Sequence, residues 1–409
     1  MSAQLSPDLR RIGEMGNAVL AHFNAIRESA PIVWNESVRG WLVTRHADVM
    51  QGFSGKLPLS CVRVEARTFS PERLALMAQR FPLMLSSLPN WIVNTDAPRH
   101  TRLRTLMAKA FSKKVVEDLR PFVQQTIANT LDSIAALPSV EFVEQVARQI
   151  TGRVILQKFG LPATYLPNLP KWSYSFNTGL GGVVDPTIEV MDSVEHSMVE
   201  MQQIFSAEIA ARRRKPTDDF LSQLVLARDG SDALTEEELL GICYLVVVAG
   251  HDTTLNTMTL GVAALCQDAA ARQFLVEHPE NILNSVMEVM RYVAMSTVQN
   301  RVASADFDWH GTKISKGDQV WLMIAAANRD PRVFAHPESI DMTRATDQVT
   351  VFAPGVHHCI GHMLAKMQLC EFFPAFFVRF PKARLRKSQL DFQPFFTFRG
   401  LDNLRVDLQ

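Results

Sequence analysis

The residues best suited to chemistry lie around a single cysteine near the C-terminal end, in the run FAPGVHHCIGH at residues 352–362. Two glycines and a proline predict a tight loop whose backbone amides approach the Cys359 sulfur, followed by a helix that starts near Gly361. Amide hydrogen bonds and a helix N-terminus both lower the pKa of a thiol. We therefore expect Cys359 to favour the thiolate state, which is the state that ligates a metal.

Three kinds of chemistry are compatible with this loop. His357, His358, Cys359 and His362 are potential ligands of a mononuclear metal ion, although adjacent residues do not easily converge on one tetrahedral centre. Cys359 is also a potential nucleophile with a histidine base, although such partners usually come from elsewhere in the fold. The third hypothesis makes Cys359 the axial thiolate ligand of a haem. The loop alone leaves all three open.

A second polar cluster interrupts a long apolar segment. Thr235 and Glu238 have the spacing of a capping box, and the residues that follow are apolar with few interruptions as far as Cys266. A helix of about 30 residues that is apolar on nearly all sides belongs at the centre of a large domain. The interruption is GHDTT at residues 250–254. Glycine and consecutive threonines are poor helix residues, so we expect this turn to be widened or bent.

Two hypotheses explain the polar turn. Threonines occur in buried helices simply because their hydroxyls bond the carbonyl one turn back, which implies no function. Asp252 favours the second hypothesis, a functional site, because a buried carboxylate must be paired, hydrated or held neutral.

The remaining segments supply the elements that position these two clusters. Apolar residues alternate or cluster over strand-like lengths at Ile32–Trp34, Gly40–Thr44 and Gln319–Ile324. No repeat, linker or low-complexity tract marks a boundary, so we expect one large domain. The run GLGG at 179–182 departs from G-x-G-x-x-G and predicts a loop. Three- and four-residue apolar spacing predicts helices over residues 101–111, 115–134, 142–158, 187–213, 218–227, 270–277 and 281–293.

Composition excludes several classes of protein. The 409 residues are 47% hydrophobic, which argues against a disordered chain, and 42 basic residues balance 42 acidic ones, which gives no net field to attract nucleic acid. The N-terminus lacks a secretory signal pattern, and no apolar run reaches the roughly 20 residues that span a bilayer. We therefore expect a cytoplasmic protein that has no membrane anchor and binds no nucleic acid. Five scattered cysteines without a C-x-x-C pair argue against a disulfide framework.

The cysteine run resembles the haem-binding loop of the cytochrome P450 family, whose pattern is F-x-x-G-x-x-x-C-x-G with a basic residue two before the cysteine. E-x-x-R alone is a common helical ion pair, but five matches in order along essentially the whole chain are specific. Ala353 departs from the pattern, which often has glycine there. The other matches are DAPRHTRLR at 96–104, AGHDTT at 249–254, EVMR at 288–291 and ANRDP at 327–331.

The resemblance implies a mainly α fold with small β-sheets (α+β), a single haem domain over residues 1–409, and haem b (iron protoporphyrin IX) as cofactor. Cys359 would be the proximal iron ligand, whose thiolate favours oxygen–oxygen cleavage. By position, the other cofactor-binding residues would be His100, Arg104, Ala249, Arg301, Phe352, Gly355, His357 and Gly361. Arg99 and Arg102 are interpreted as a solvated basic face of the same helix.

Further roles follow from the same resemblance. Glu288, Arg291 and Arg344 would form a buried ion network behind the cysteine loop, which is a structural role. Thr253 would contact dioxygen and Asp252 would feed protons inward, so these two are the expected catalytic residues.

The resemblance also suggests positions for a substrate pocket, which are nearly all apolar. Such a pocket suits a hydrophobic small molecule such as a terpenoid, a steroid or an alkyl-aromatic compound. Several of these residues are equally well explained as plain core. Arg80 is either a partner for a substrate carboxylate or a solvated side chain. The pocket candidates are Phe81, Leu85, Leu245, Val248, Thr297 and Phe398.

We find no flavin, nicotinamide or iron–sulfur segment, so electrons must come from another protein. In similar bacterial proteins the donor is a ferredoxin with its NAD(P)H-driven ferredoxin reductase, and a basic patch on the cysteine side would attract an acidic partner. The patch candidates are Lys109, Lys113, Lys114 and Lys366.

The predicted function is a haem-thiolate monooxygenase that inserts one atom of dioxygen into a hydrophobic substrate. Two alternatives are a peroxide-dependent peroxygenase, which the Asp252–Thr253 pair disfavours, and a non-catalytic haem sensor or ligand-binding protein, which needs no such pair. We expect a monomer.

Overall fold

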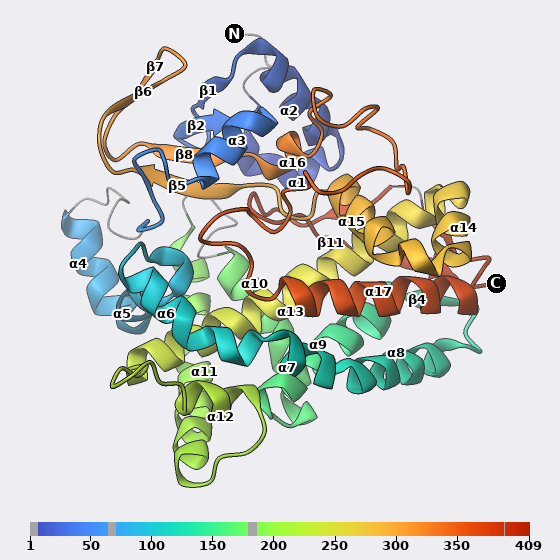
Figure 1. The fold of residues 1–409 in the computed structure, drawn as a ribbon, viewed down its shortest axis with the longest axis horizontal. Coiled ribbons are helices and arrows are strands. Elements are labelled where there is room, and N and C mark those ends of the chain that lie inside the picture. The colour runs from blue at the N-terminus through green and yellow to red at the C-terminus, as the bar shows by residue number, and fades with distance from the viewer. Residues whose placement is uncertain (1–6, 64–70, 179–185, 388) are drawn as a thin grey trace.

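The computed structural model describes residues 7–63, 71–178, 186–387 and 389–409, so the predicted loop at 179–182 lies outside it. Helices make up most of the structure, and the main sheet lies to one side of them (Figure 1). This arrangement confirms the expected mainly α fold with small β-sheets.

The main sheet brings together segments that are far apart in the sequence. It contains β1 (Ile32–Asn35), β2 (Gly40–Val43), β8 (Gln319–Leu322), β5 (Gln299–Ala303) and β3 (Leu59–Ser60) in that order. The strands β2 and β8 are parallel, and the other neighbours are antiparallel. The three predicted strands correspond to β1, β2 and β8.

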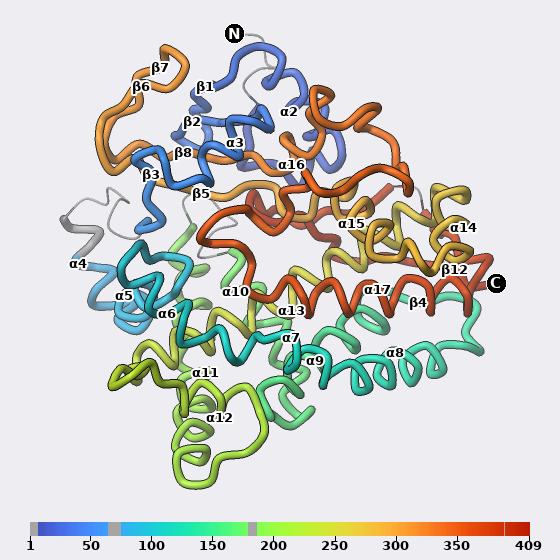
Figure 2. Tube along the Cα trace, in the orientation of Figure 1, coloured from blue at the N-terminus to red at the C-terminus, as the bar shows by residue number. Residues whose placement is uncertain are grey.

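Smaller sheets hold the C-terminal segment against the helices. The strand β12 (Arg405–Asp407) lies between β4 (Ser139–Glu141) and β9 (Arg384–Leu385), close to the C-terminus (Figure 2). The remaining pairs are β6 (Phe307–Trp309) with β7 (Thr312–Ile314) and β10 (Asp391–Phe392) with β11 (Leu401–Asn403).

The predicted helices are present, with two differences. The segment 115–134 divides into two helices, because Pro121 occupies the first turn of the second one and cannot continue the first. The segment 142–158 begins with a π-helical turn, η5 (Val143–Ala147). The helices other than the central one are α1 (Ile12–Met15), α2 (Ala18–Ser29), α3 (His46–Phe53), α4 (Pro71–Arg80), α5 (Pro82–Ser87), α6 (Arg99–Ala108), α7 (Lys113–Asp118), α8 (Arg120–Ile134), α9 (Arg148–Phe159), α10 (Leu169–Asn177), α11 (Ile188–Arg214), α12 (Phe220–Val225), α14 (Ala269–Glu277), α15 (Ile282–Val293), α16 (Ile324–Ala327) and α17 (His362–Arg379).

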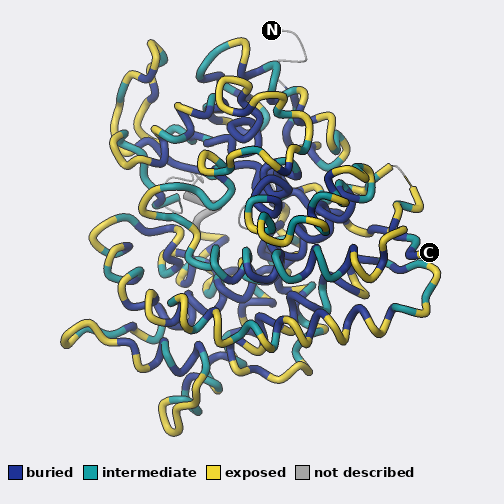
Figure 3. The backbone as a smooth tube through the Cα atoms, turned by 45° about the vertical axis from the view of Figure 1, so that its right-hand side comes forward, coloured by how far each residue is buried: buried dark blue, intermediate teal, exposed yellow. Residues whose placement is uncertain are grey.

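The central helix α13 (Glu236–Gln267) is the predicted buried helix, and the expected capping box is formed. The Thr235 hydroxyl accepts from the Glu238 amide at 3.2 Å, and the Glu238 carboxylate accepts from the Thr235 amide at 3.1 Å. The helix packs against α9, α10, α15 and α17, and most of its residues are buried. Figure 3 shows that buried backbone fills the interior of the molecule. Helix α13 is the one helix of the described residues that is long and apolar enough to cross a membrane, and 78% of its most apolar window is buried inside the protein.

The expected widening at residues 250–254 is wrong, because α13 remains α-helical through this turn. The Thr253 hydroxyl donates to the Ala249 carbonyl at 2.7 Å, and the Thr257 hydroxyl donates to the Thr253 carbonyl at 2.8 Å. The hydroxyls therefore bond carbonyls that lie one turn back, and the helix continues without a break.

Candidate functional site

The cysteine loop has the tight geometry that its glycines predict. The Cys359 amide donates to the Phe352 carbonyl at 2.9 Å, and α17 begins directly after Gly361. Gly355 has φ of 91°, and a Cβ atom there would lie 2.4 Å from the Phe53 carbonyl oxygen on α3, so the position requires glycine. Ala353 has φ of 51°, a left-handed conformation that costs an alanine about 1 kcal/mol. This strain explains why glycine is common at position 353 in the family pattern.

The prediction that the loop lowers the pKa of the Cys359 thiol is wrong for the protein without a bound metal ion or cofactor. Burial raises the pKa of Cys359, and this effect outweighs hydrogen bonds from the Gly361 and His362 amides and the positive charge of Arg104, which lower it. The burial comes from segments distant in sequence, although Cys359 as a residue keeps accessible surface. A thiolate at this position therefore needs additional positive charge, such as a metal ion would bring.

Four basic side chains gather beside the loop, and they come from three parts of the chain. The ring centroids of His100 on α6 and His357 lie 3.9 Å apart. Burial lowers the pKa of both, to about 3 for His357, and the charges of Arg104 and Arg301 lower the two values further. Among the described residues, no carboxylate forms a salt bridge with any of the four, and the buried His100 Nε2 has no hydrogen-bond partner. The group therefore fits a ligand that brings its own carboxylates, as a haem does.

The structure brings Glu288, Arg291 and Arg344 together. Arg291 donates two hydrogen bonds to the Glu288 carboxylate at 2.7 and 2.8 Å, and both side chains are fully buried. Arg344 donates to the same carboxylate at 3.1 Å. Arg291 also donates to three backbone carbonyls, those of Asn328, Pro337 and Ser339. The network thus ties α15 to the segment that leads into the cysteine loop.

One face of α13 is accessible although most of the helix is buried. Leu245, Ala249 and Thr253 follow each other at four-residue intervals and all retain accessible surface. Residues with this spacing share a helix face, so the three form one accessible face of α13. Asp252, the residue before Thr253, has a different environment from these three residues. Burial raises the pKa of Asp252, whose Oδ2 accepts from the side-chain amides of Asn177 at 2.6 Å and Asn256 at 3.1 Å.

The pocket candidates divide into two groups. Leu85, Leu245 and Phe398 retain accessible surface, as pocket residues must. Phe81 and Val248 are buried within the apolar cluster of α4, α5, α11 and α13, where they serve as core. Thr297 is fully buried, and its hydroxyl has no hydrogen-bond partner.

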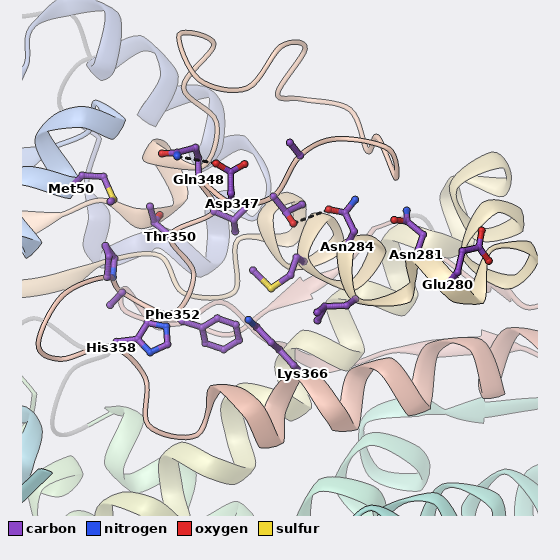
Figure 4. Close-up of a pocket in the computed structure, with 17 residues that line it drawn as sticks. Met50, Glu280, Asn281, Asn284, Asp347, Gln348, Thr350, Phe352, His358 and Lys366 are labelled. Atoms are coloured by element: carbon purple, nitrogen blue, oxygen red, sulfur yellow. Dashed lines mark hydrogen bonds between the residues drawn. The ribbon is translucent and has the colours of Figure 1, made fainter. Parts of the chain in front are cut away.

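A hollow of about 800 Å³ adjoins the outer side of the cysteine loop, between the loop, α15 and residues 345–350 (Figure 4). Phe352, His358 and Lys366 lie together at one end of it, and the Lys366 ammonium is 5.2 Å from the centre of the Phe352 ring. Lys366 forms no salt bridge within the part of the chain that the structure describes. Its charge is therefore available to a binding partner.

The other candidate lysines differ from one another. Lys109 and Lys113 are exposed at the end of α6 and the start of α7, and α7 packs against α17, which carries Lys366. Lys114 is paired with Asp118 at 2.7 Å, so its charge is already compensated.

Two basic residues have partners that their sequence neighbours do not suggest. Arg80 on α4 is paired with Asp192 on α11, so it is neither free for a substrate nor simply solvated. The interpretation of Arg102 as part of a solvated face is wrong, since it donates to Glu238 at 2.8 Å and to Asp232 at 2.5 Å. Arg99 on the same helix donates to the Pro89 carbonyl at 3.0 Å. The contact of Asn177 with Asp252 was not predicted, because no sequence motif links the two residues.

Comparisons with known proteins agree with this geometry. The sequence model of the cytochrome P450 family matches residues 162–390. The chain is 31% identical to cytochrome P450 CYP107DY1 of Priestia megaterium over 84% of this chain and 83% of that protein. It is 30% identical to the biotin biosynthesis cytochrome P450 of Bacillus subtilis over 95% of both chains. The crystal structure of P450BioI in complex with an acyl carrier protein that bears hexadec-9Z-enoic acid superposes with a TM-score of 0.89 at 27% identity, over 97% of this chain and 99% of that one.

Proposed function

Because this chain belongs to the cytochrome P450 family, we propose that it inserts one atom of dioxygen into a hydrophobic small molecule, with Cys359 as the ligand of the haem iron. Members of the family are haem-thiolate monooxygenases. When bound, the haem activates dioxygen at its iron, and thiolate ligation favours oxygen–oxygen cleavage. The observation that carries the assignment of Cys359 is its place in a strained, glycine-bounded loop next to two arginines and two histidines that form no salt bridge with a described carboxylate.

The residues around the cofactor site have separable roles in this proposal. His100, Arg104, Arg301 and His357 hold the haem carboxylates, because none of the four forms a salt bridge with a carboxylate of the described residues. The accessible face of α13 carries Thr253, whose hydroxyl holds a proton near the reacting oxygen. Asp252 supplies protons to that position from the other side of the helix turn.

The substrate class follows from the apolar residues of the accessible face of α13. We propose a terpenoid, a steroid or an alkyl-aromatic compound, held by shape and by burial of apolar surface. Relatives act on varied molecules, as names such as vitamin D(3) 25-hydroxylase and mycinamicin IV hydroxylase/epoxidase indicate. The screen should therefore include compounds of each class.

We propose that the electron donor is a ferredoxin, which an NAD(P)H-driven ferredoxin reductase reduces. Family members use separate redox partners, and the hollow beside the cysteine loop with the uncompensated Lys366 gives an acidic protein a place to dock.

A single domain over 1–409 is supported by the pairing of β12 with β4, which joins the chain end to the helices. We also propose that the protein is a monomer and that it is located in the cytoplasm.

The first experiment is the absorption spectrum of the dithionite-reduced protein under carbon monoxide, for the wild type and Cys359→Ser. A strongly red-shifted Soret band that is lost in the variant supports the proposal. An ordinary histidine-type spectrum in the wild type would overturn the ligand assignment. Spin-state shifts upon addition of apolar compounds then identify the substrate class.

A further inference from the structure

Asp252 opens onto a hollow that is separate from the face of α13 that carries Thr253. The hollow holds about 350 Å³ and lies between α9, α10, α13 and the C-terminal strands. Successive residues of a helix point about 100° apart, so Asp252 and Thr253 face different sides of the same turn. At roughly 30 Å³ per molecule, the hollow has room for several waters. The polar and charged residues that line it are Arg148, Lys171, Tyr174, Asn177, Asp252, Gln393 and Asp402.

The charges of the residues around the hollow attract protons and do not attract anions. Arg148 is paired with Glu144 at 2.8 Å, and Lys171 is paired with Glu200 at 3.0 Å, so both cations are compensated. Neither Asp252 nor Asp402 forms a salt bridge with any residue that the structure describes. The exposed Asp402 carboxylate, which has no cationic partner among the described residues, makes the potential at this side of the hollow negative, which raises the local concentration of protons.

The two carboxylates that line this space differ in exposure. Asp402 on β11 is exposed, whereas Asp252 is 8% exposed. Asn177 and Asn256 both donate to Oδ2 of Asp252, and no described residue bonds its Oδ1. The amides thus fix the carboxylate and leave one oxygen to exchange a proton. Burial raises the pKa of Asp252 and of Asp402, and nearby Asp391 raises that of Asp402 further, while Gln393 holds Asp402 by a hydrogen bond.

We propose that this hollow is the inlet through which solvent protons reach Asp252, and that Asp402 collects them at its mouth. Asp402 gives its proton to water in the hollow, and water gives a proton to Oδ1 of Asp252. Solvent then protonates Asp402 again, so the transfer needs no electron and no other reactant. The inference rests on the proposed function, because a monooxygenase consumes protons in each turnover, and it assigns Asp402 a role as a positioning and proton-collecting residue outside the haem pocket.

The test compares Asp402→Asn with Asp308→Asn, a control at an exposed carboxylate on β6 that does not line the hollow. The first readout is independent of turnover. The carboxylic acid band of Asp252, identified by infrared difference against Asp252→Asn, is titrated in the resting protein. Removal of the Asp402 charge makes Asp252 easier to ionise, so the titration midpoint falls by about 0.5 pH units in Asp402→Asn. It stays unchanged in the control.

The second readout is turnover in H₂O and D₂O. Asp402→Asn is expected to be several-fold slower, with a larger solvent isotope effect, and Asp402→Glu restores the wild-type values. An unchanged midpoint together with an unchanged isotope effect would overturn the inlet. Inhibition by millimolar Ca²⁺ that disappears in Asp402→Asn, with no change in isotope effect, would instead show a cation site and would also overturn it. The infrared shift does not depend on a known substrate, so failure of the proposed function is detected separately by the carbon monoxide spectrum.

Discussion

Lys158 donates a hydrogen bond from its buried ammonium to the backbone carbonyl of Ala110, 3.0 Å away. The ammonium also lies 4.5 Å from the ring centres of both Phe111 and Phe220, and no carboxylate compensates it among the described residues. Burial lowers its pKa to about 8. Because the unfolded chain then binds more protons than the folded one between pH 8 and 10.5, stability is expected to rise with pH across this window.

Lys158→Met should remove this dependence. We expect the variant to be more stable than the wild type at pH 7, by up to about 3 kcal/mol before the lost hydrogen bond is subtracted. The two proteins should converge above pH 10. Urea unfolding at pH 7, 9 and 10.5 measures the difference, and equal pH slopes would contradict the assignment.

Loss of a basic side chain from the group beside the cysteine loop should weaken haem retention. His100→Ala removes a buried donor whose expected partner is a haem carboxylate, so haem is expected to dissociate about tenfold faster. Thr105→Ala is the control, because Thr105 is exposed on the same helix and bonds only the Thr101 carbonyl. Transfer of haem to apomyoglobin gives both rates. Equal rates in the two variants would show that His100 does not hold the cofactor.

The buried ion network should be far more sensitive than a surface pair. Glu288→Gln leaves Arg291 and Arg344 without a counter-charge in the interior, which is expected to destabilise the protein by roughly 3–5 kcal/mol. Lys114→Gln breaks the exposed pair with Asp118 and should change stability by less than about 0.5 kcal/mol. Chemical denaturation of the haem-free proteins compares them directly.

The Thr253 hydroxyl should govern how reducing equivalents are used. Thr253→Ala is expected to consume NAD(P)H at a comparable rate but to release mainly hydrogen peroxide, because the proton held near the reacting oxygen is lost. Thr253→Ser keeps the hydroxyl and should keep most of the product yield. The ratio of product to NAD(P)H consumed is the measurement, and tight coupling in Thr253→Ala would refute the role.

Partner binding should depend on Lys366 more than on Lys114. Lys366→Gln removes an uncompensated charge at the hollow, so the affinity for a reduced ferredoxin is expected to fall several-fold at low salt. Lys114→Gln removes a charge that Asp118 already balances and should have little effect. Titration at several salt concentrations tests both, and a flat salt dependence in the wild type would count against the basic patch.

Features with local causes were predictable from the sequence. The tight loop around Cys359 follows from its glycines and proline, and the start of α13 follows from Thr235 and Glu238. The signals lie within a few residues of the features that they predict. The break before α8 was also visible in Pro121, but helical spacing on both sides concealed it.

Features that depend on distant segments were missed or mistaken. The salt bridge between Arg102 and Glu238 joins residues of different helices, so neither sequence neighbourhood indicates it. The raised pKa of Cys359 arises from burial by other parts of the chain, which outweighs the local amides that the sequence reveals. Asp252 was predicted as a site residue from the polar turn that contains it. Asn177 and Asp402 line the same hollow but come from distant segments, so they were not predicted.

The order of synthesis limits when the cofactor site comes into existence. The sheet needs both β2, near the beginning of the chain, and β8, which ends at Leu322, while Cys359 and β12 follow later still. His100 therefore leaves the ribosome long before the loop that carries His357. Contacts across such sequence separations form slowly. Haem ligation by this loop therefore requires synthesis to have passed residue 359, and shortened chains that end before it cannot retain the cofactor through a thiolate from this loop.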